Sequence, residues 1–217
     1  MVVAAPVATL HLSRPLWTGV SRVLVVGSPP DRPVREPDDP GPSAGYISPV
    51  SNEPEPVIEN RTFEEIEIGE SAALERKLTW RDIELFAVMS GDVNPAHVDE
   101  EYARSDIFHA IVAHGMWGAS LISALLGTRL PGPGTIYLEQ TLRFRHPVVI
   151  GDTITVSVTV ASKDPERRRV VLDCRCLNQR DETVIDGTAT VLAPTEKVRR
   201  PRFELPEVTL REHDAGV

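Results

Sequence analysis

The sequence predicts an α+β fold in which an antiparallel sheet wraps round a central apolar helix. Two observations support this prediction. Residues 113–127 are apolar on nearly every side of a helix and are rich in Gly, Ala and Ser, which is typical of a helix inside a core. After residue 134 the hydrophobic period changes, and four strand-like runs follow one another with turn residues between them. The helix is too short to span a bilayer, since a span needs about 20 apolar residues.

The composition of the 217-residue chain is that of a soluble globular protein, with 41% hydrophobic and 25% charged residues. The formal net charge of −9 argues against nucleic acid or a membrane as a partner, because such partners bind concentrated basic surfaces. Residues 1–12 are apolar but have no basic start and are interrupted by Pro6, so we expect no signal peptide. A cytoplasmic location is therefore expected.

Three regions of the chain differ in composition. Nine of the 19 prolines fall between residues 29 and 56, interleaved with charged and small residues that cannot build a core. We expect residues 1–56 to form a disordered proline-rich arm and residues 57–193 to form the folded domain. Charge and proline return after that point, so residues 194–217 are expected to be a charged tail or linker.

The folded domain is expected to begin with an edge segment and a turn that closes at Gly69, followed by a first strand over residues 72–78. Thr79 and Asp82 have the spacing of a capping box, in which each side chain accepts from a free amide at a helix start. Apolar residues then recur at helical spacing up to Gly91, where the helix should end. A second short helix is expected around residues 100–104.

The segment between these two helices, residues 90–97, reads Ser-Gly-Asp-Val-Asn-Pro-Ala-His. Its glycine and proline interrupt any helix, so its polar side chains lie on a bent segment where they can converge. Asp92 and His97 can share one water as a base and an acid that exchange a proton near neutral pH. The same string taken alone also fits a turn, because Asp and Asn stabilise turns and Pro follows them readily.

The four runs after the apolar helix cover residues 136–144, 153–160, 170–177 and 183–191. Short turns join them, so consecutive strands should pair antiparallel. Cys174 and Cys176 lie two residues apart on one face of the third run, where they bond poorly to each other. We expect both to be buried free thiols, because the sequence has no other cysteine to complete a zinc site.

Several segments together resemble the MaoC-like (R)-specific enoyl-CoA hydratases. They are residues 90–97, Phe108, the His-Gly-Met of residues 114–116, and residues 134–140 and 147–152. The resemblance covers residues 61–193 and implies a hotdog fold, usually paired as a homodimer. In this family the domain also occurs as the front half of chains fused to a phosphate acyltransferase, and the charged tail resembles such a linker. A downstream acyltransferase is thus an implied partner.

The resemblance also implies the reaction, which is the reversible hydration of a trans-2-enoyl-CoA to an (R)-3-hydroxyacyl-CoA by a hydro-lyase. The family's water-activating pair matches Asp92 and His97, and its supporting amide matches Asn94. The backbone N–H that contacts the substrate oxyanion falls on Gly115, and a helical serine that lines the site falls on Ser123. No cofactor or metal is expected, because Asp92 and His97 lack the further ligands of a zinc site.

Other interpretations stay open. The same loop would serve a (3R)-hydroxyacyl-acyl carrier protein dehydratase, and the fold alone would suit a thioesterase or a non-catalytic hotdog partner subunit. His114 is either a rival catalytic imidazole or a structural group. Ser123 is either a site residue or a packing residue. Three cations either bind the phosphates of coenzyme A or are simply solvated: Arg143, Arg145 and Lys163.

Overall fold

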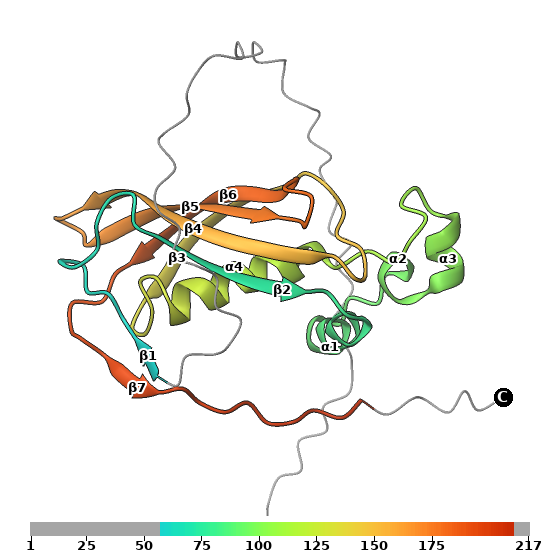
Figure 1. Ribbon diagram of the computed structural model, residues 1–217, viewed down its shortest axis with the longest axis horizontal. Helices are drawn as coiled ribbons and strands as arrows, with labels where there is room; N and C mark the ends of the chain where they lie inside the picture. Colours follow the sequence, from blue (N-terminus) through green and yellow to red (C-terminus); the bar gives the residue numbers. More distant parts are fainter. Residues whose placement is uncertain (1–56, 211–217) are drawn as a thin grey trace, which may run out of the picture. The chain divides into compact units, whose positions relative to one another are not determined.

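The computed structural model describes residues 57–210, so the arm expected over residues 1–56 lies outside the described residues (Figure 1). None of the helices in residues 57–210 has the length and apolar character needed to cross a membrane. In chain order the elements are β1 (Val57–Glu59), β2 (Ser71–Lys77), α1 (Trp80–Ser90), α2 (Pro95–Val98), α3 (Glu100–Ser105), α4 (Gly115–Thr128), β3 (Ile136–Phe144), β4 (Thr153–Asp164), β5 (Arg169–Leu177), β6 (Thr183–Leu192) and β7 (Arg199–Pro201).

Helix α1 begins and ends where the sequence predicts. The Asp82 carboxylate accepts from the Thr79 backbone N–H at 2.9 Å, and the Thr79 hydroxyl accepts from the Asp82 N–H at 3.3 Å, which completes the capping box. Gly91 ends the helix with φ of 76°, a left-handed conformation that glycine adopts without strain. Ile83 and Ala87 are buried, so α1 is fixed to the core at one face and holds the polar loop at its C-terminus.

A five-stranded antiparallel sheet has the order β2-β4-β5-β6-β3. The expected pairing of consecutive strands is confirmed for β4 with β5 and for β5 with β6, but it is wrong for β3, which pairs with β6 instead of β4. The reason is the connection over residues 145–152, which is not a tight hairpin turn. It is held to the segment before α4 by a Val112–Val149 bridge and by a 2.7 Å hydrogen bond from Ala113 N–H to Val148 O.

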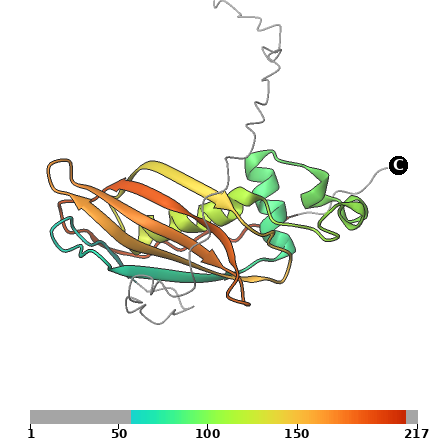
Figure 2. The same cartoon turned by 90° about the horizontal axis from the view of Figure 1, so that it is seen from above.

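Helix α4 lies along the concave face of this sheet, as the fold class predicts (Figures 1 and 2). Its buried side carries Trp117, Ile122, Leu125 and Leu126, which join the buried residues of β4, β5 and β6 in one core. A Cβ at Gly118 would lie 2.4 Å from Cδ1 of Ile185 on β6, so a larger residue there would require the Ile185 side chain to move. The predicted core helix is therefore confirmed, and it packs closely against β6 at Gly118.

The burial of α4 is one-sided, whereas the sequence indicates a helix contacted on most sides. An exposed stripe runs along the opposite face of the helix and comprises Met116, Ser120, Ser123, Ala124 and Gly127. The edge strand β3 is exposed as well, and its Phe144 reaches the first residue of α4. This part of the surface is made of small and apolar residues, and no strand of residues 57–210 pairs with the outer edge of β3.

Residues 57–61 and 194–201 are joined at the end of the sheet distant from α1. β1 pairs antiparallel with β7, and the Asn60 amide links three segments: its Nδ2 donates to Pro133 O at 3.0 Å and to Glu196 O at 2.8 Å. Its Oδ1 accepts from the Val198 N–H at 2.9 Å. The domain boundary at residue 193 stays a prediction, but residues 196–201 are bound against the domain.

Both cysteines are free and buried on β5, as the sequence predicts. Burial raises the pKa of Cys174 to about 11 and that of Cys176 to about 12. Both thiols are therefore protonated at neutral pH and behave as small apolar core residues.

Candidate active site

The loop after α1 holds Asp92 in a defined backbone conformation. The Asp92 N–H donates to the Ser90 hydroxyl at 3.2 Å, and its Oδ1 accepts from the Asn94 N–H at 3.2 Å. Asn94 in turn caps α2, because its side-chain oxygen accepts from the Ala96 N–H at 3.1 Å. The sequence did not indicate this one-turn helix, although Asn before Pro is a recognised helix start. Asn94 therefore contributes as a cap and a backbone support.

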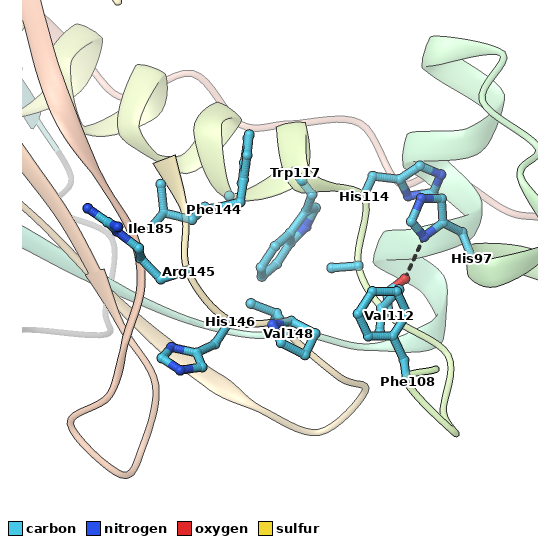
Figure 3. A pocket seen from close by; sticks show the side chains of 14 residues that line it. His97, Phe108, Val112, His114, Trp117, Phe144, Arg145, His146, Val148 and Ile185 are labelled. Carbon is cyan, nitrogen blue, oxygen red and sulfur yellow. Dashed lines mark hydrogen bonds between the residues drawn. The ribbon is translucent and has the colours of Figure 1, made fainter. Parts of the chain in front are cut away.

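His97 lies on α2 with its ring turned toward the segment before α4 (Figure 3). Its Nδ1 is 2.8 Å from the carbonyl oxygen of Val112. A carbonyl only accepts, so Nδ1 carries the proton and Nε2 keeps a lone pair. The hydrogen bond fixes both the tautomer and the orientation of the ring. His97 is therefore available to accept a proton at Nε2.

His114 joins this pair in the structure, and it is the residue of the site that sequence reasoning underrated. It is only 2% exposed, and its Nε2 lies 3.0 Å from the backbone carbonyl oxygen of Asp92. Its ring stacks on that of His97, with centroids 4.0 Å apart and 36° between the planes. Phe86 of α1 packs against it at a centroid distance of 4.9 Å.

A pocket of about 310 Å³ opens beside His97 (Figure 3). Its walls come from the start of α4, the end of β3, the 145–148 segment and β6, and they are mostly apolar: Trp117, Phe144, Val148 and Ile185. Gly115 also lines the pocket as the first residue of α4, where a backbone N–H has no partner within the helix. A Cβ at that position would lie 3.0 Å from the Phe144 ring, so glycine lets this ring lie close against the start of α4.

A model of the MaoC like domain family matches residues 64–175. The chain belongs to the MaoC-like family. It is 50% identical over 132 residues to an (R)-specific enoyl-CoA hydratase of Rhodospirillum rubrum, covering 61% of this chain and 91% of the relative. It is 47% identical over 139 residues to a 3-hydroxybutyryl-CoA dehydratase of Methylorubrum extorquens, covering 64% of this chain and 88% of the relative.

A more distant relative is a mitochondrial 3-hydroxyacyl-[acyl-carrier-protein] dehydratase of Arabidopsis thaliana, 33% identical over 132 residues that cover 59% of this chain and 78% of the relative. Among solved structures, the unliganded R-hydratase PhaJ1 of Pseudomonas aeruginosa superposes with a TM-score of 0.69 and 43% identity, covering 71% of this chain and 99% of that chain. The sheet and central helix of this MaoC-like chain are therefore a hotdog fold.

The MaoC-like site gathers a carboxylate and two imidazoles, since Asp92, His97 and His114 have candidate metal-ligand atoms within 4.8 Å of one another. Each imidazole has one ring nitrogen at a backbone carbonyl, His97 Nδ1 at Val112 O and His114 Nε2 at Asp92 O. The other nitrogen of each ring is left without a protein partner by these bonds. The chemistry these groups support is proton transfer and the holding of a water.

Ser123 is not brought to this site. It is exposed on α4, and eight residues of helix separate it from Gly115, which is about 12 Å at 1.5 Å per residue. Among the three candidate cations, Lys163 is used internally, since its ammonium donates to Phe63 O at 2.6 Å and to Ile66 O at 2.5 Å. Arg145 lines the pocket while paired with Asp186 at 3.0 Å.

Proposed function

We propose that this MaoC-like chain is a hydro-lyase that reversibly hydrates trans-2-enoyl-CoA to (R)-3-hydroxyacyl-CoA. The observation that supports this most strongly is that a carboxylate and an imidazole lie together at the edge of an apolar pocket. Asp92 lies within 4.8 Å of His97, and His97 lines an apolar pocket that also contains the start of α4. The relatives that are 47–50% identical carry the names of a hydratase and a dehydratase of this reaction class.

In the proposed mechanism one water lies between Asp92 and His97. One Asp92 oxygen is used by the Asn94 N–H, which leaves the other to accept a hydrogen bond from this water. The lone pair on His97 Nε2 accepts the second hydrogen bond that this water donates. The water oxygen then bonds to the β-carbon of the enoyl group, the released proton is held by the pair, and a proton is returned to the α-carbon. Such acid–base participation typically contributes about 10²–10⁴ in rate.

Negative charge develops on the thioester oxygen as the enolate forms, and we assign its stabilisation to the Gly115 N–H. This amide belongs to the first turn of α4, where free N–H groups and the helix dipole favour an anion. Removing such a donor typically costs about 10²–10³ in rate. Asn94 supports the same geometry indirectly, because it caps the helix that bears His97.

The second candidate function is dehydration of a (3R)-hydroxyacyl group carried on acyl carrier protein. The relative from Arabidopsis thaliana favours it, since that protein bears the name of such a dehydratase. The groups around the reacting carbons would be the same for both thioesters. The two functions would differ only where the carrier meets the surface, so direct comparison of the two substrates decides between them.

We also propose that the protein is a homodimer that associates through the exposed stripe of α4 and the edge strand β3. Ile136, Leu138 and Met116 are 54%, 46% and 58% exposed there, and among the described strands β3 has a partner on one edge only. A second copy would cover both features. A cytoplasmic location is supported by the two free thiols, and a phosphate acyltransferase remains a proposed downstream partner.

The proposed function is tested with the purified full-length chain and crotonyl-CoA. Loss of the enoyl absorbance without release of free CoA is expected, with the (R)-alcohol as the product. The same assay with crotonyl-acyl carrier protein measures the preference between carriers. Release of free CoA without any hydration would indicate a thioesterase and would refute the proposal, and no reaction with either carrier would support a non-catalytic subunit.

A further inference from the structure

His114 contacts both members of the proposed catalytic pair, although it belongs to a different part of the chain. Its Nε2 donates to the Asp92 backbone carbonyl at 3.0 Å, and its ring packs on the His97 ring with centroids 4.0 Å apart. It also immediately precedes Gly115, the first residue of α4. One buried side chain therefore contacts the Asp92 backbone and the His97 ring, and its own residue is bonded to the proposed oxyanion donor.

The Asp92 loop has few other links to the core. Asp92 itself is exposed, and its two remaining hydrogen bonds, to Ser90 and from Asn94, are made within the loop. Of these three hydrogen bonds, only the one from His114 joins Asp92 to a residue outside the loop, 22 positions away in the sequence. Without it, residues 91–94 would be held by their local hydrogen bonds and by their attachment to α1 and to α2, which is itself tied to Val112 through Ala96 O at 3.3 Å. His97, in contrast, has its own bond to Val112 and does not depend on His114 for its tautomer.

We propose that His114 is a positioning residue for hydration, which acts by holding the Asp92 carboxylate at the water through the Nε2–H···O=C bond. The proposal rests on the proposed function and specifies how its geometry is maintained. His114 does not need to touch the substrate or transfer a proton. Its ring supplies a packing surface for His97 and Phe86, while its Nε2 proton sets the position of Asp92.

The role can be separated from simple core packing because the two contacts of His114 are chemically different. His114→Gln keeps an N–H donor close to the position of Nε2 and removes the ring. His114→Phe keeps a ring and removes the donor. His114→Leu removes both and is smaller than Phe, so it keeps the test valid where Phe does not fold in a 2% exposed site.

We expect the Phe and Leu variants to lose about 10–100-fold in kcat for crotonyl-CoA with little change in KM, because displacing a reacting group by about 1 Å can cost about 10²-fold. The Gln variant should lose less than about fivefold in kcat, since the donor is restored. Thermal unfolding of each variant reports the packing separately. The proposal would be overturned if kcat fell in proportion to the melting temperature, whether or not the variant keeps an N–H donor. Equal kcat in the Phe variant, the Gln variant and the wild type would also overturn it.

A readout that does not need turnover separates this proposal from the proposed function. Nitrogen-15 spectra of histidine-labelled wild type should show His114 protonated at Nε2 and unprotonated at Nδ1. The backbone amide signals of residues 92–94 should shift in His114→Phe and stay near wild type in His114→Gln. If the wild type hydrates no enoyl thioester while these shifts appear, the proposed function is wrong and the positioning contact stands. Signals of residues 92–94 that are unchanged in the Phe variant would refute the contact.

Discussion

The side chains of Asp92 and His97 contribute little to the hydrophobic core, so their chemical role can be tested by mutation without unfolding the protein. Asp92 is exposed and bonds only within its own loop and to His114, while His97 is half-buried on a one-turn helix. Replacing Asp92 with Asn keeps the size and one acceptor oxygen but removes the charge. Loss of catalysis without loss of the fold would therefore assign the chemistry to the side chain.

We expect Asp92→Asn and His97→Ala each to lower kcat for crotonyl-CoA by about 10²–10⁴, because each removes one of the two groups that share the water's proton. The melting temperature should change little. The matched control is Glu101→Gln, which neutralises an exposed carboxylate on α3 and should leave kcat unchanged. Near-normal turnover in either site variant would contradict the mechanism.

Trp117 is the largest side chain in the pocket wall and points into the pocket between Phe144 and His114 (Figure 3). An indole there limits the room for an acyl chain. We expect Trp117→Leu to raise kcat/KM for octenoyl-CoA relative to crotonyl-CoA by about tenfold, which corresponds to about two further methylenes accommodated at about 0.8 kcal/mol each. Trp80→Leu, which changes a tryptophan outside the pocket, should leave this ratio unchanged. An unaltered ratio in the Trp117 variant would show that another residue sets the length.

The site could be predicted from sequence only where its residues are close together in the chain. Asp92, Asn94 and His97 fall within six positions, so their spacing and turn chemistry indicated them. The role of His114 was left open by the sequence, because its contact with Asp92 depends on the path of the chain through the Val112–Val149 bridge, which no local pattern encodes. The assignment of Ser123 to the site stays a prediction, and this residue is not among those that line the pocket of this chain.

At the scale of elements, the capping box at the start of α1 stabilises the helix from whose C-terminal end the Asp92 loop begins. Burial by itself would raise the pKa of Asp82, but hydrogen bonds from Thr79 and from Arg76 outweigh it, and the pKa is lowered. The contribution of Asp82 to stability is therefore fully present above its unfolded pKa of about 3.9 and is lost as pH falls through its lower folded pKa.

We expect Thr79→Ala to reduce the free energy of unfolding at pH 7 by about 1 kcal/mol, the usual cost of losing a cap. The measurement is urea unfolding followed by circular dichroism. Thr128→Ala is the control, because that hydroxyl bonds only back to Ala124 O within α4 and does not cap the helix. The difference in stability between wild type and Asp82→Asn should shrink below about pH 4. A difference that grows with acidification would contradict the assignment.

The elements themselves were largely predictable, and the pairing of β3 was not. The alternation in β4 and the capping box of α1 are local patterns, and both appear where the sequence indicates them. The partner of β3 depends on whether residues 145–152 form a hairpin or bind elsewhere, and this is decided by contacts with residues 112 and 113. Strand order is thus a tertiary property, even in a chain whose strands are evident.

At the scale of the whole molecule, the open side of α4 and the free edge of β3 carry the prediction of a dimer. We expect Leu138→Asp to give a monomer in sedimentation equilibrium, because a charge at the centre of the proposed contact would be desolvated without a partner. Ile68→Asp is the matched control, since Ile68 is 68% exposed in the turn before β2, away from both features, and should leave a dimer. A wild-type monomer, or a dimeric Leu138 variant, would refute this interface.

The pairing of β1 with β7 also makes a circular permutation of the domain feasible. Val57 lies opposite Pro201, so the chain enters and leaves this domain at adjacent points. A short linker could therefore join residue 201 to residue 57, with new ends opened at the exposed turn between Arg180 and Asp181. Such a circular permutant should keep the circular dichroism and the hydratase activity of the parent, since the new ends cut neither α4 nor the loop that carries Asp92.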